Sequence, residues 1–524
     1  MRRLLSITLC AAAATLLAPQ TEARSPRDDD EERPSPSPAH MKVYDFSSIE
    51  VMGELGVTAG GAQDIRFFRD RAASGEVPHP AVFTPEGLFS EHDLPLESRG
   101  PCRELVCAFG EASDARLLVQ PEVLWLAQLG FSSGMDPATF RRAPLNLVAV
   151  VDKSGSMSGQ PMEMVKKALH KLADQLDDRD RLQIVLYGDT SHVHLEATGG
   201  AEKGRLHSAI DAIAINGSTY MEAGLKLGFA EARKSAARFD GLTRVMLYTD
   251  ERPNVGRTDA ESFMGMAEAN SRAGIGMTTI GVGVQFGAEL ATKISSVRGG
   301  NLFFFNDDAA IEKTFGEELD TIVTELAYDM ALEVRPAPGL KIAGMYGIPG
   351  EALQWTPEGG LKVQIATMFA SKRAGAIYVA FSSEAGPNLP ARRLERGDSA
   401  GSVSLVYTLR DGRVVSGAAD LTYVAPGQTS TGLFRGALLV NQATALKEAT
   451  RLHHEKNDQE GAYQLVHAVA SIYRQIADEE LRSEVELTEN LERTLAKLSG
   501  HEGEPSSVRP GPRINPVTGL PAED

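Results

Sequence analysis

Apolar residues between positions 144 and 326 gather in short runs that alternate with segments of helical periodicity. The first run, 145–151, holds a single polar residue and is followed at once by Asp152. Such a run is typical of a parallel strand with both faces covered. Further strands are predicted at 182–187, 244–249, 277–282 and 302–305, and helices at 161–176, 203–214, 219–236, 260–273, 287–297 and 309–325. Repeated strand–helix units predict an α/β fold with a doubly wound, mostly parallel sheet.

The flanks of this block are patterned differently. Residues 42–143 mix a helical segment at 63–71 with strand-like runs at 115–119 and 124–129, and short strands with turn signals follow the block, at 330–334, 376–381 and 403–409. After position 432 the periodicity is helical, at 433–455, 459–477 and 480–498, which most simply predicts a small bundle. A tetratricopeptide-like platform is the alternative, but no repeat consensus supports it.

The predicted domains are a signal peptide at 1–23, a disordered leader at 24–41, an N-terminal mixed region at 42–143, the α/β block at 144–326, a β-rich region at 327–431, a helical bundle at 432–499 and a disordered tail at 500–524. The signal peptide rests on Arg2 and Arg3, an apolar stretch at 4–18 and small residues before a cleavage point after Ala23. The alternative, an uncleaved membrane helix, needs about 20 apolar residues, more than this stretch supplies. We therefore expect a secreted or periplasmic protein with no transmembrane segment after cleavage.

Composition narrows the classes of partner. Hydrophobic residues make up 42% and charged residues 24% of the 524 residues, which is ordinary for globular domains. The formal net charge of −18 argues against nucleic acid as a partner, because phosphate backbones are bound by basic surfaces.

Cleavage of a signal peptide would leave two cysteines, Cys102 and Cys107. In an oxidising compartment so close a pair predicts a local disulfide, the alternative being two buried thiols. Two cysteines alone do not make a structural zinc site, which usually takes four ligands.

Three separate segments of the α/β block carry oxygen-bearing side chains at positions that meet in a parallel sheet. Asp152, Ser154 and Ser156 follow the first strand, Thr219 stands at the start of a helix, and Asp250 follows the strand at 244–249. Ligands of open α/β sheets bind at the carboxyl ends of the strands. Carboxylate and hydroxyl oxygens favour Mg²⁺, Mn²⁺ or Ca²⁺ over thiophilic metals. An ion held largely by neutral hydroxyls keeps much of its charge and attracts a carboxylate from a partner.

In this order and spacing, the five residues resemble the metal-ion-dependent adhesion site of von Willebrand factor A (VWA) domains. The resemblance covers roughly residues 144–326 and includes the phrase Gly281-Val282-Gly283 after a strand. It implies that Ser154, Ser156 and Thr219 bind the ion directly or nearly so, and that the two aspartates often act through water. It also implies that a Glu or Asp of a protein partner completes the metal shell. The alternative is a VWA fold whose site is degenerate and empty.

The flanks extend the resemblance to secreted bacterial VWA proteins and to the inter-alpha-trypsin inhibitor heavy chains. That layout implies a β-sandwich, built from strands on both sides of the VWA block, into which the block is inserted. Two positions depart from the common pattern: Glu251 stands where many members have Gly, and Tyr220 where a small or polar residue is common.

We therefore expect a non-enzymatic, secreted binding protein that engages a protein partner through a divalent metal. A structural or scaffold protein with a vestigial metal site is the alternative, and a metal-dependent hydrolase is less favoured because no general base is evident. The segment 155–159 imitates a nucleophile elbow, but Met157 holds the position of the nucleophile. The pairs His192/His194 and His453/His454 are interpreted as solvated faces, since no further ligands stand at metal spacing.

Overall fold

The computed structural model describes residues 55–501, apart from 63–64, 98–99, 251–255, 257, 284–292, 294–295, 306, 349–352, 386–392 and 477. The predicted signal peptide, leader and Glu251 lie outside the described residues, as do nearly all of the predicted tail and most of the predicted helix at 287–297. No helix in the described part of the chain is long and apolar enough to cross a membrane.

The α/β block contains a seven-stranded sheet with the order β2-β10-β9-β8-β5-β6-β7. Its strands are β2 (Gly61–Ala62), β5 (Leu145–Asp152), β6 (Arg181–Tyr187), β7 (Ser191–Gly199), β8 (Leu242–Thr249), β9 (Ile275–Val282) and β10 (Gly300–Phe305). Neighbouring strands are parallel except β6 and β7, which pair antiparallel with two register shifts, so the sheet is mixed. The prediction of an α/β fold is confirmed, and β7 is a further strand of the sheet beyond the five predicted.

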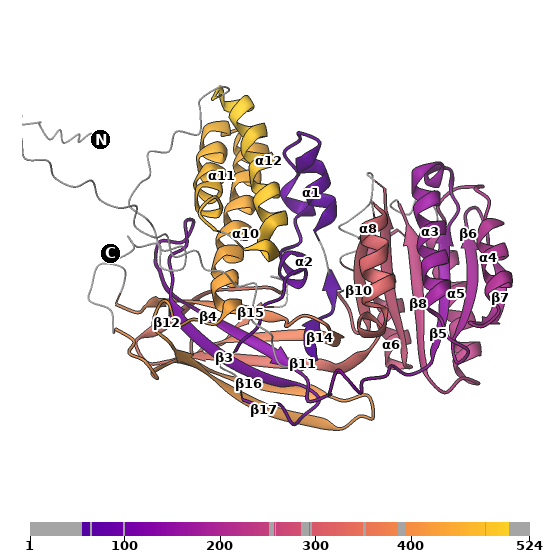
Figure 1. Cartoon of the computed structure of the whole chain (residues 1–524), viewed down its shortest axis with the longest axis horizontal. Helices are drawn as coiled ribbons and strands as arrows, with labels where there is room; N and C mark the ends of the chain where they lie inside the picture. The colour runs from indigo at the N-terminus through magenta and orange to yellow at the C-terminus, as the bar shows by residue number, and fades with distance from the viewer. Residues whose placement is uncertain are drawn as a thin grey trace, which may run out of the picture. The chain divides into compact units, whose positions relative to one another are not determined.

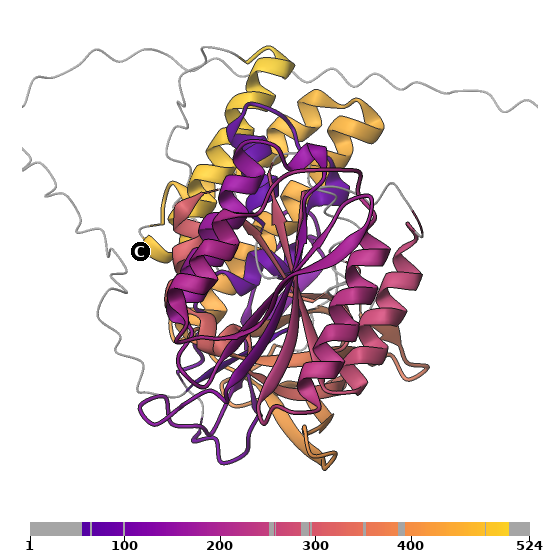
Figure 2. The same cartoon turned by 90° about the vertical axis from the view of Figure 1, so that its right-hand side faces the viewer.

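Helices pack on both faces of this sheet (Figure 2). They are α3 (Gln160–Gln175), α4 (Lys203–Asp211), α5 (Met221–Ala236), α6 (Ala260–Arg272), α8 (Asp308–Ile311) and α9 (Leu319–Ile322), with a 3-10 turn η2 (Gly155–Met157) and a π-helical turn η3 (Glu312–Glu317). Alternate residues of β5 explain the two layers: Leu147 packs with α3 and α4, whereas Val148 packs with α5 and α6. Neither face of the strand is exposed, which is why its sequence is almost continuously apolar.

The single helix predicted over 309–325 is wrong. The segment divides into α8, the π-helical turn η3 and α9, and strand β11 already begins at Glu325. Gly316 lies inside the wide turn and weakens regular helix there. Next to it, Phe315 packs edge-on against Phe305 with ring centroids 5.4 Å apart.

Strands from both sides of the α/β block join one ten-stranded sheet with the order β1-β14-β11-β16-β17-β3-β4-β15-β12. They are β1 (Gly56–Ala59), β3 (Cys107–Asp114), β4 (Val123–Ser132), β11 (Glu325–Pro336), β12 (Leu340–Tyr346), β13 (Leu353–Trp355), β14 (Leu361–Ser371), β15 (Ala376–Ser383), β16 (Ser399–Thr408) and β17 (Val414–Tyr423), of which β13 pairs with β14. In place of the expected sandwich, the sheet closes on itself where Gly56 of β1 pairs with Ser132 of β4. A Cβ at Gly56 would lie 1.9 Å from the Arg373 carbonyl oxygen, so the closure requires glycine.

The strand predicted at 115–119 is also wrong. These residues leave β3 and turn toward helix α10 (Thr431–Lys456), where the Leu118 amide donates to Asn441 Oδ1 over 2.9 Å. The apolar character of Ala115 and Leu117 reflects burial in the core beneath the helices rather than strand pairing.

The C-terminal helical segment is confirmed. It consists of α10, α11 (Gln459–Tyr473), a 3-10 turn η5 (Glu479–Leu481) and α12 (Arg482–Ser499), and these helices stand over one face of the ten-stranded sheet (Figure 1). Helix α1 (Arg66–Ala73), the turn η1 (Pro80–Val82) and helix α2 (Pro85–Ser90), from the N-terminal region, share their apolar core.

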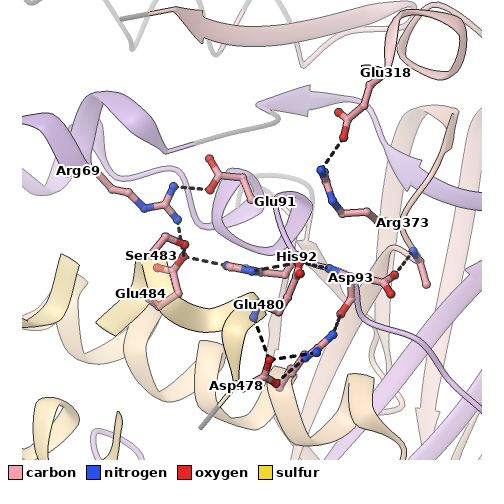
Figure 3. A network of polar contacts seen from close by, with 12 residues as sticks. Arg69, Glu91, His92, Asp93, Glu318, Arg373, Asp478, Glu480, Ser483 and Glu484 are labelled. Carbon is pink, nitrogen blue, oxygen red and sulfur yellow. Dashed lines mark hydrogen bonds and ion pairs between the residues drawn. The ribbon is translucent and has the colours of Figure 1, made fainter. Parts of the chain in front are cut away.

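A buried polar network joins the N-terminal helices to α12 (Figure 3). The Arg69 guanidinium forms ion pairs with Glu91 and Glu484, and His92 Nε2 lies 2.8 Å from Glu484 Oε1. Glu484 and His92 are both almost fully buried, so each charge depends on its neighbours.

Cys102 and Cys107 form a disulfide. The alternative of two buried thiols is therefore wrong. The bridge joins the start of β3 to the loop that precedes it.

Candidate functional site

The candidate site lies where four parallel strands end. β5 ends at Asp152, β6 at Tyr187, β8 at Thr249 and β9 at Val282. The register places Asp152 directly beside Tyr187. Because all four strands run in the same direction, the loops after them meet at one edge of the sheet.

Asp152 is fully buried and is fixed by two neighbours. The Ser154 amide donates to Asp152 Oδ1 over 2.9 Å, and the Thr249 hydroxyl donates to Asp152 Oδ2 over 3.2 Å. The bond from the Ser154 amide ties the loop after β5 to the last residue of that strand. The other ties that aspartate to the end of β8.

The two serines continue this arrangement to the second aspartate. Ser154 Oγ lies 3.0 Å from Ser156 Oγ, and Ser156 Oγ donates to Asp250 Oδ1 over 3.1 Å. Ser154 and Asp250 are buried, whereas Ser156 is exposed. Hydrogen bonds therefore connect the four predicted residues, from the Asp152 carboxylate through the Ser154 amide and the two serine hydroxyls to Asp250, and this chain of hydrogen bonds reaches solvent at Ser156.

Thr219 lies on a loop that is bonded to the same segment. The Gly155 amide donates to the Gly217 carbonyl over 3.1 Å, and the Asn216 amide donates to the Lys153 carbonyl over 2.7 Å. Thr219 itself is 1% exposed and precedes α5. The structure thus brings its loop against the loop of the serines, as the sequence predicts.

Burial dominates the electrostatics of the site. It raises the pKa of Asp152, while the hydrogen bonds from Ser154 act in the opposite direction. Burial and the nearby Asp152 carboxylate raise the pKa of Tyr187 well above its ordinary value. The Tyr187 hydroxyl is buried beside the Asp152 carboxylate.

The donor set suits a hard divalent cation. Asp152, Asp250 and the three hydroxyl residues offer oxygen only, which is the preference of Mg²⁺, Mn²⁺ and Ca²⁺. Among the described residues, the candidate site included, no group of three or more His, Cys, Asp or Glu side chains is placed to hold a metal ion. The residues that sequence analysis missed at this edge are Thr249 and Tyr187. Their positions as the last residues of predicted strands were the available signal.

Tyr220, one of the two departures from the common pattern, is half-buried at the start of α5. A Cβ at Gly256 would lie 2.3 Å from its ring and 2.8 Å from Glu222 Oε2, so Gly256 packs closely on this tyrosine. Gly256 thus lies against the start of α5.

The histidine pairs that sequence analysis set aside have other contacts. His194 Nε2 lies 2.8 Å from the Ala209 carbonyl oxygen, and His454 Nε2 lies 2.9 Å from that of Val77. His453 Nδ1 faces the side chain of Gln459. These contacts agree with the interpretation of both pairs as ordinary polar faces.

Comparison with known proteins gives the domain its family. Residues 146–317 match the family model described as von Willebrand factor type A domain. The uncharacterized protein YfbK of Escherichia coli (strain K12) is 29% identical over 195 residues, which cover 37% of this chain and 34% of that protein. The uncharacterized protein sll0103 of Synechocystis sp. is 30% identical over 175 residues, covering 33% and 41%. Inter-alpha-trypsin inhibitor heavy chain H1 of Mesocricetus auratus is 27% identical over 148 residues, covering 27% and 16%.

In each of these relatives the matched segment spans less than half of the relative's own length. Among solved structures, the von Willebrand factor type A protein from Catenulispora acidiphila is 15% identical, with a TM-score of 0.44, and the match covers 79% of this chain and 89% of that one. The predicted resemblance to VWA proteins and to the inter-alpha-trypsin inhibitor heavy chains is confirmed.

Proposed function

Because residues 146–317 form a VWA domain, we propose that this chain is a secreted or periplasmic binding protein that holds a protein partner through a divalent cation. The cation is Mg²⁺, with Mn²⁺ and Ca²⁺ as alternatives, and its binding residues are Asp152, Ser154, Ser156, Thr219 and Asp250. The observation that supports this proposal most directly is the chain of hydrogen bonds that connects Asp152, Ser154, Ser156 and Asp250 at one edge of the sheet. The secreted location is supported by the basic and apolar pattern of the N-terminus.

The charge of the site favours an acidic group on the partner. Two carboxylates balance a divalent cation only when both bind it directly, and hydroxyl ligands leave most of the cation's charge uncompensated. Ser156 is the exposed residue of this chain of hydrogen bonds, so a ligand would reach the cation from that side. A Glu or Asp side chain of the partner meets both requirements.

The proposed role is binding rather than catalysis. Both carboxylates of the site accept hydrogen bonds. Asp152 accepts from Ser154 and Thr249, and Asp250 accepts from Ser156. A hydrolase would need a further base within hydrogen-bond reach of an attacking water. We assign that role to none of the site residues.

The first experiment compares two serines of one loop. Ser156→Ala removes a proposed ligand, whereas Ser158→Ala removes an exposed hydroxyl two residues away. In isothermal titration with Mg²⁺, we expect Ser158→Ala to bind as the wild type does. Ser156→Ala should bind Mg²⁺ at least about 10–100-fold more weakly, because loss of even an outer-shell partner of a metal typically weakens binding by that factor. Equal affinity of all three proteins would contradict the proposed metal site.

The second experiment tests the partner. Immobilised wild type, Ser156→Ala and Ser158→Ala are exposed to extracellular or periplasmic fractions in Mg²⁺ and in EDTA. The proposal expects specific retention only by the wild type and Ser158→Ala, and only in Mg²⁺. Retention that survives EDTA and Ser156→Ala would instead favour the scaffold role, in which the ten-stranded sheet or the C-terminal helices carry the interaction.

A further inference from the structure

Two helices of the VWA domain carry the same short pattern, a histidine followed four residues later by an aspartate. On α3 these are His170 and Asp174, and on α4 they are His207 and Asp211. Each aspartate bonds the histidine of the other helix: His170 Nε2 lies 3.0 Å from Asp211 Oδ1, and His207 Nε2 lies 3.0 Å from Asp174 Oδ1. Residues four apart share a helix face, so two antiparallel helices bring the four side chains into one crossed cluster.

The two imidazole rings meet head to head within this cluster. Their Nδ1 atoms are 2.6 Å apart, the ring centroids are 4.8 Å apart, and the ring planes differ by 24°. The side chains of His170 and His207 are 30% and 31% exposed. Both rings are thus partly accessible to solvent.

The aspartates determine which nitrogen carries the proton. A carboxylate accepts hydrogen bonds only, so each Nε2 must be an N–H donor. In a neutral ring of that form, Nδ1 presents a bare lone pair. Two such lone pairs at 2.6 Å repel each other unless a cation, either a shared proton or a metal ion, lies between them.

We propose that His170 Nδ1 and His207 Nδ1 together bind a divalent transition metal, with Zn²⁺ as the probe and Cu²⁺ as the other member of the same class. Imidazole nitrogen is a preferred ligand of both ions. A metal-bound histidine typically donates its other ring N–H to a carboxylate, which is the arrangement that Asp174 and Asp211 provide here. Water completes the coordination of the ion.

The required movement is small. Zn–N bonds of about 2.0–2.1 Å in a tetrahedral site place two ligand nitrogens roughly 3.3 Å apart, so the rings must separate by about 0.7 Å. Partly exposed side chains can do this by rotation. The helices themselves are already held together, because Lys203 Nζ donates to the carbonyls of Ala173 and Leu176 and Lys166 Nζ donates to that of Asp211.

This pair differs from the other histidine pair of the domain. The rings of His192 and His194 on β7 are perpendicular to each other, with centroids 6.4 Å apart, and His194 Nε2 faces a backbone carbonyl oxygen. The double variant His192→Gln/His194→Gln is therefore a matched control that removes two histidines without touching the α3–α4 cluster.

The test is calorimetric titration of the full chain, prepared without a histidine tag, with Zn²⁺ in excess Mg²⁺ so that oxygen sites are occupied. We expect one Zn²⁺ per chain in the wild type and in the β7 control. Binding should be lost in His170→Gln and in His207→Gln. Asp174→Asn and Asp211→Asn should weaken it by about 10–100-fold, the usual cost of removing a carboxylate behind a metal-bound histidine.

Circular dichroism of each variant verifies folding. A wild type that takes up no Zn²⁺ would overturn the proposal and leave a shared proton between the rings. Unchanged binding in both His170→Gln and His207→Gln would overturn it equally. Because Zn²⁺ acts here through α3 and α4, neither result bears on the proposed Mg²⁺ site.

Discussion

Ser156 Oγ donates a hydrogen bond to Asp250 Oδ1 over 3.1 Å, although 94 residues separate the two in the sequence. One residue lies in the loop after β5 and the other follows β8, and these strands are direct neighbours in the sheet. The contact therefore depends on the register of the central strands, in which Val151 pairs with Tyr248. Any change that disturbs that register should disturb the proposed metal site.

Removal of the metal should lower the thermal stability of the VWA domain. An ion that binds only the folded state at about 100 times its Kd adds about 2.7 kcal/mol. For a domain of this size that free energy corresponds to roughly 5–10 °C in Tm. Mg²⁺ should raise the Tm of the wild type by this order, and EDTA should reverse the rise. In Asp250→Asn both effects should vanish, as measured by scanning calorimetry; a full Mg²⁺ response in that variant would argue against the site.

Two helical glycines should respond to alanine in opposite directions. A Cβ at Gly436 in α10 would lie 1.9 Å from the Tyr378 ring, whereas a Cβ at Gly265 in α6 would meet nothing within 4 Å. Gly436→Ala should therefore destabilise the protein by about 1–3 kcal/mol through overpacking. Gly265→Ala should stabilise it by about 0.5–1 kcal/mol, because alanine favours helix. Urea unfolding measures both, and a stabilising Gly436→Ala would show that α10 does not pack on β15 as described.

The central strands and the candidate site could be predicted because their signals are local. The run 145–151 is buried on both sides, so its apolar character is continuous, and the side chains that follow such strands must meet at one edge. The same logic placed Asp152 and Asp250 together without knowledge of any distance. Thr219 was placed at the same edge because it stands where a loop leads into a helix.

The remaining structure depends on pairings between distant segments. In strand β7 only Leu195 and Thr198 are buried, and the strand pairs through two register shifts, so its pattern is not that of a buried strand. The closure of the ten-stranded sheet rests on one pair, Gly56 with Ser132. The contact of His170 with His207 depends on how α3 and α4 are aligned, and no periodicity within either helix reports that alignment.

Glu86 should reduce stability as its carboxyl ionises. It is buried in α2, and burial raises its pKa to about 7, with its own backbone and Lys447 opposing the shift. The folded state therefore holds this proton more tightly than the unfolded state, for which the pKa is about 4.5. Its contribution to stability is fully present below pH 4.5 and is lost as the pH rises through 7. Glu86→Gln should be more stable than the wild type at pH 8, by roughly 3 kcal/mol at most, and similar to it at pH 4.5. Urea unfolding at pH 4.5 and at pH 8 measures this effect. If the free energies of unfolding of Glu86→Gln and the wild type differ by the same amount at both pH values, ionisation of Glu86 is not the cause.

His92 should lose its stabilising effect in a higher pH window. Burial disfavours the protonated ring, yet the nearby carboxylates of Glu480, Glu484 and Glu91 raise the pKa of His92 to about 9 (Figure 3). Arg69 is the cation that also faces Glu484 and Glu91. Since the unfolded value is about 6.5, the contribution of His92 is fully present below pH 6.5 and disappears as the pH rises through 9.

Between pH 6.5 and pH 10 the free energy of unfolding of the wild type should therefore fall by up to roughly 3 kcal/mol more than that of His92→Gln. The reason is that glutamine keeps a hydrogen-bond donor but has no proton to release. Glu480→Gln offers an independent measure. It removes one of the carboxylates that hold the proton, so the loss of stability should move to lower pH while its sign stays the same. Denaturant unfolding of the wild type, His92→Gln and Glu480→Gln at intervals between pH 6.5 and pH 10 gives the free energy of unfolding as a function of pH. If the stabilities of the wild type and of His92→Gln change in parallel with pH, His92 is not charged in the folded protein, and Arg69 supplies the positive charge beside Glu484.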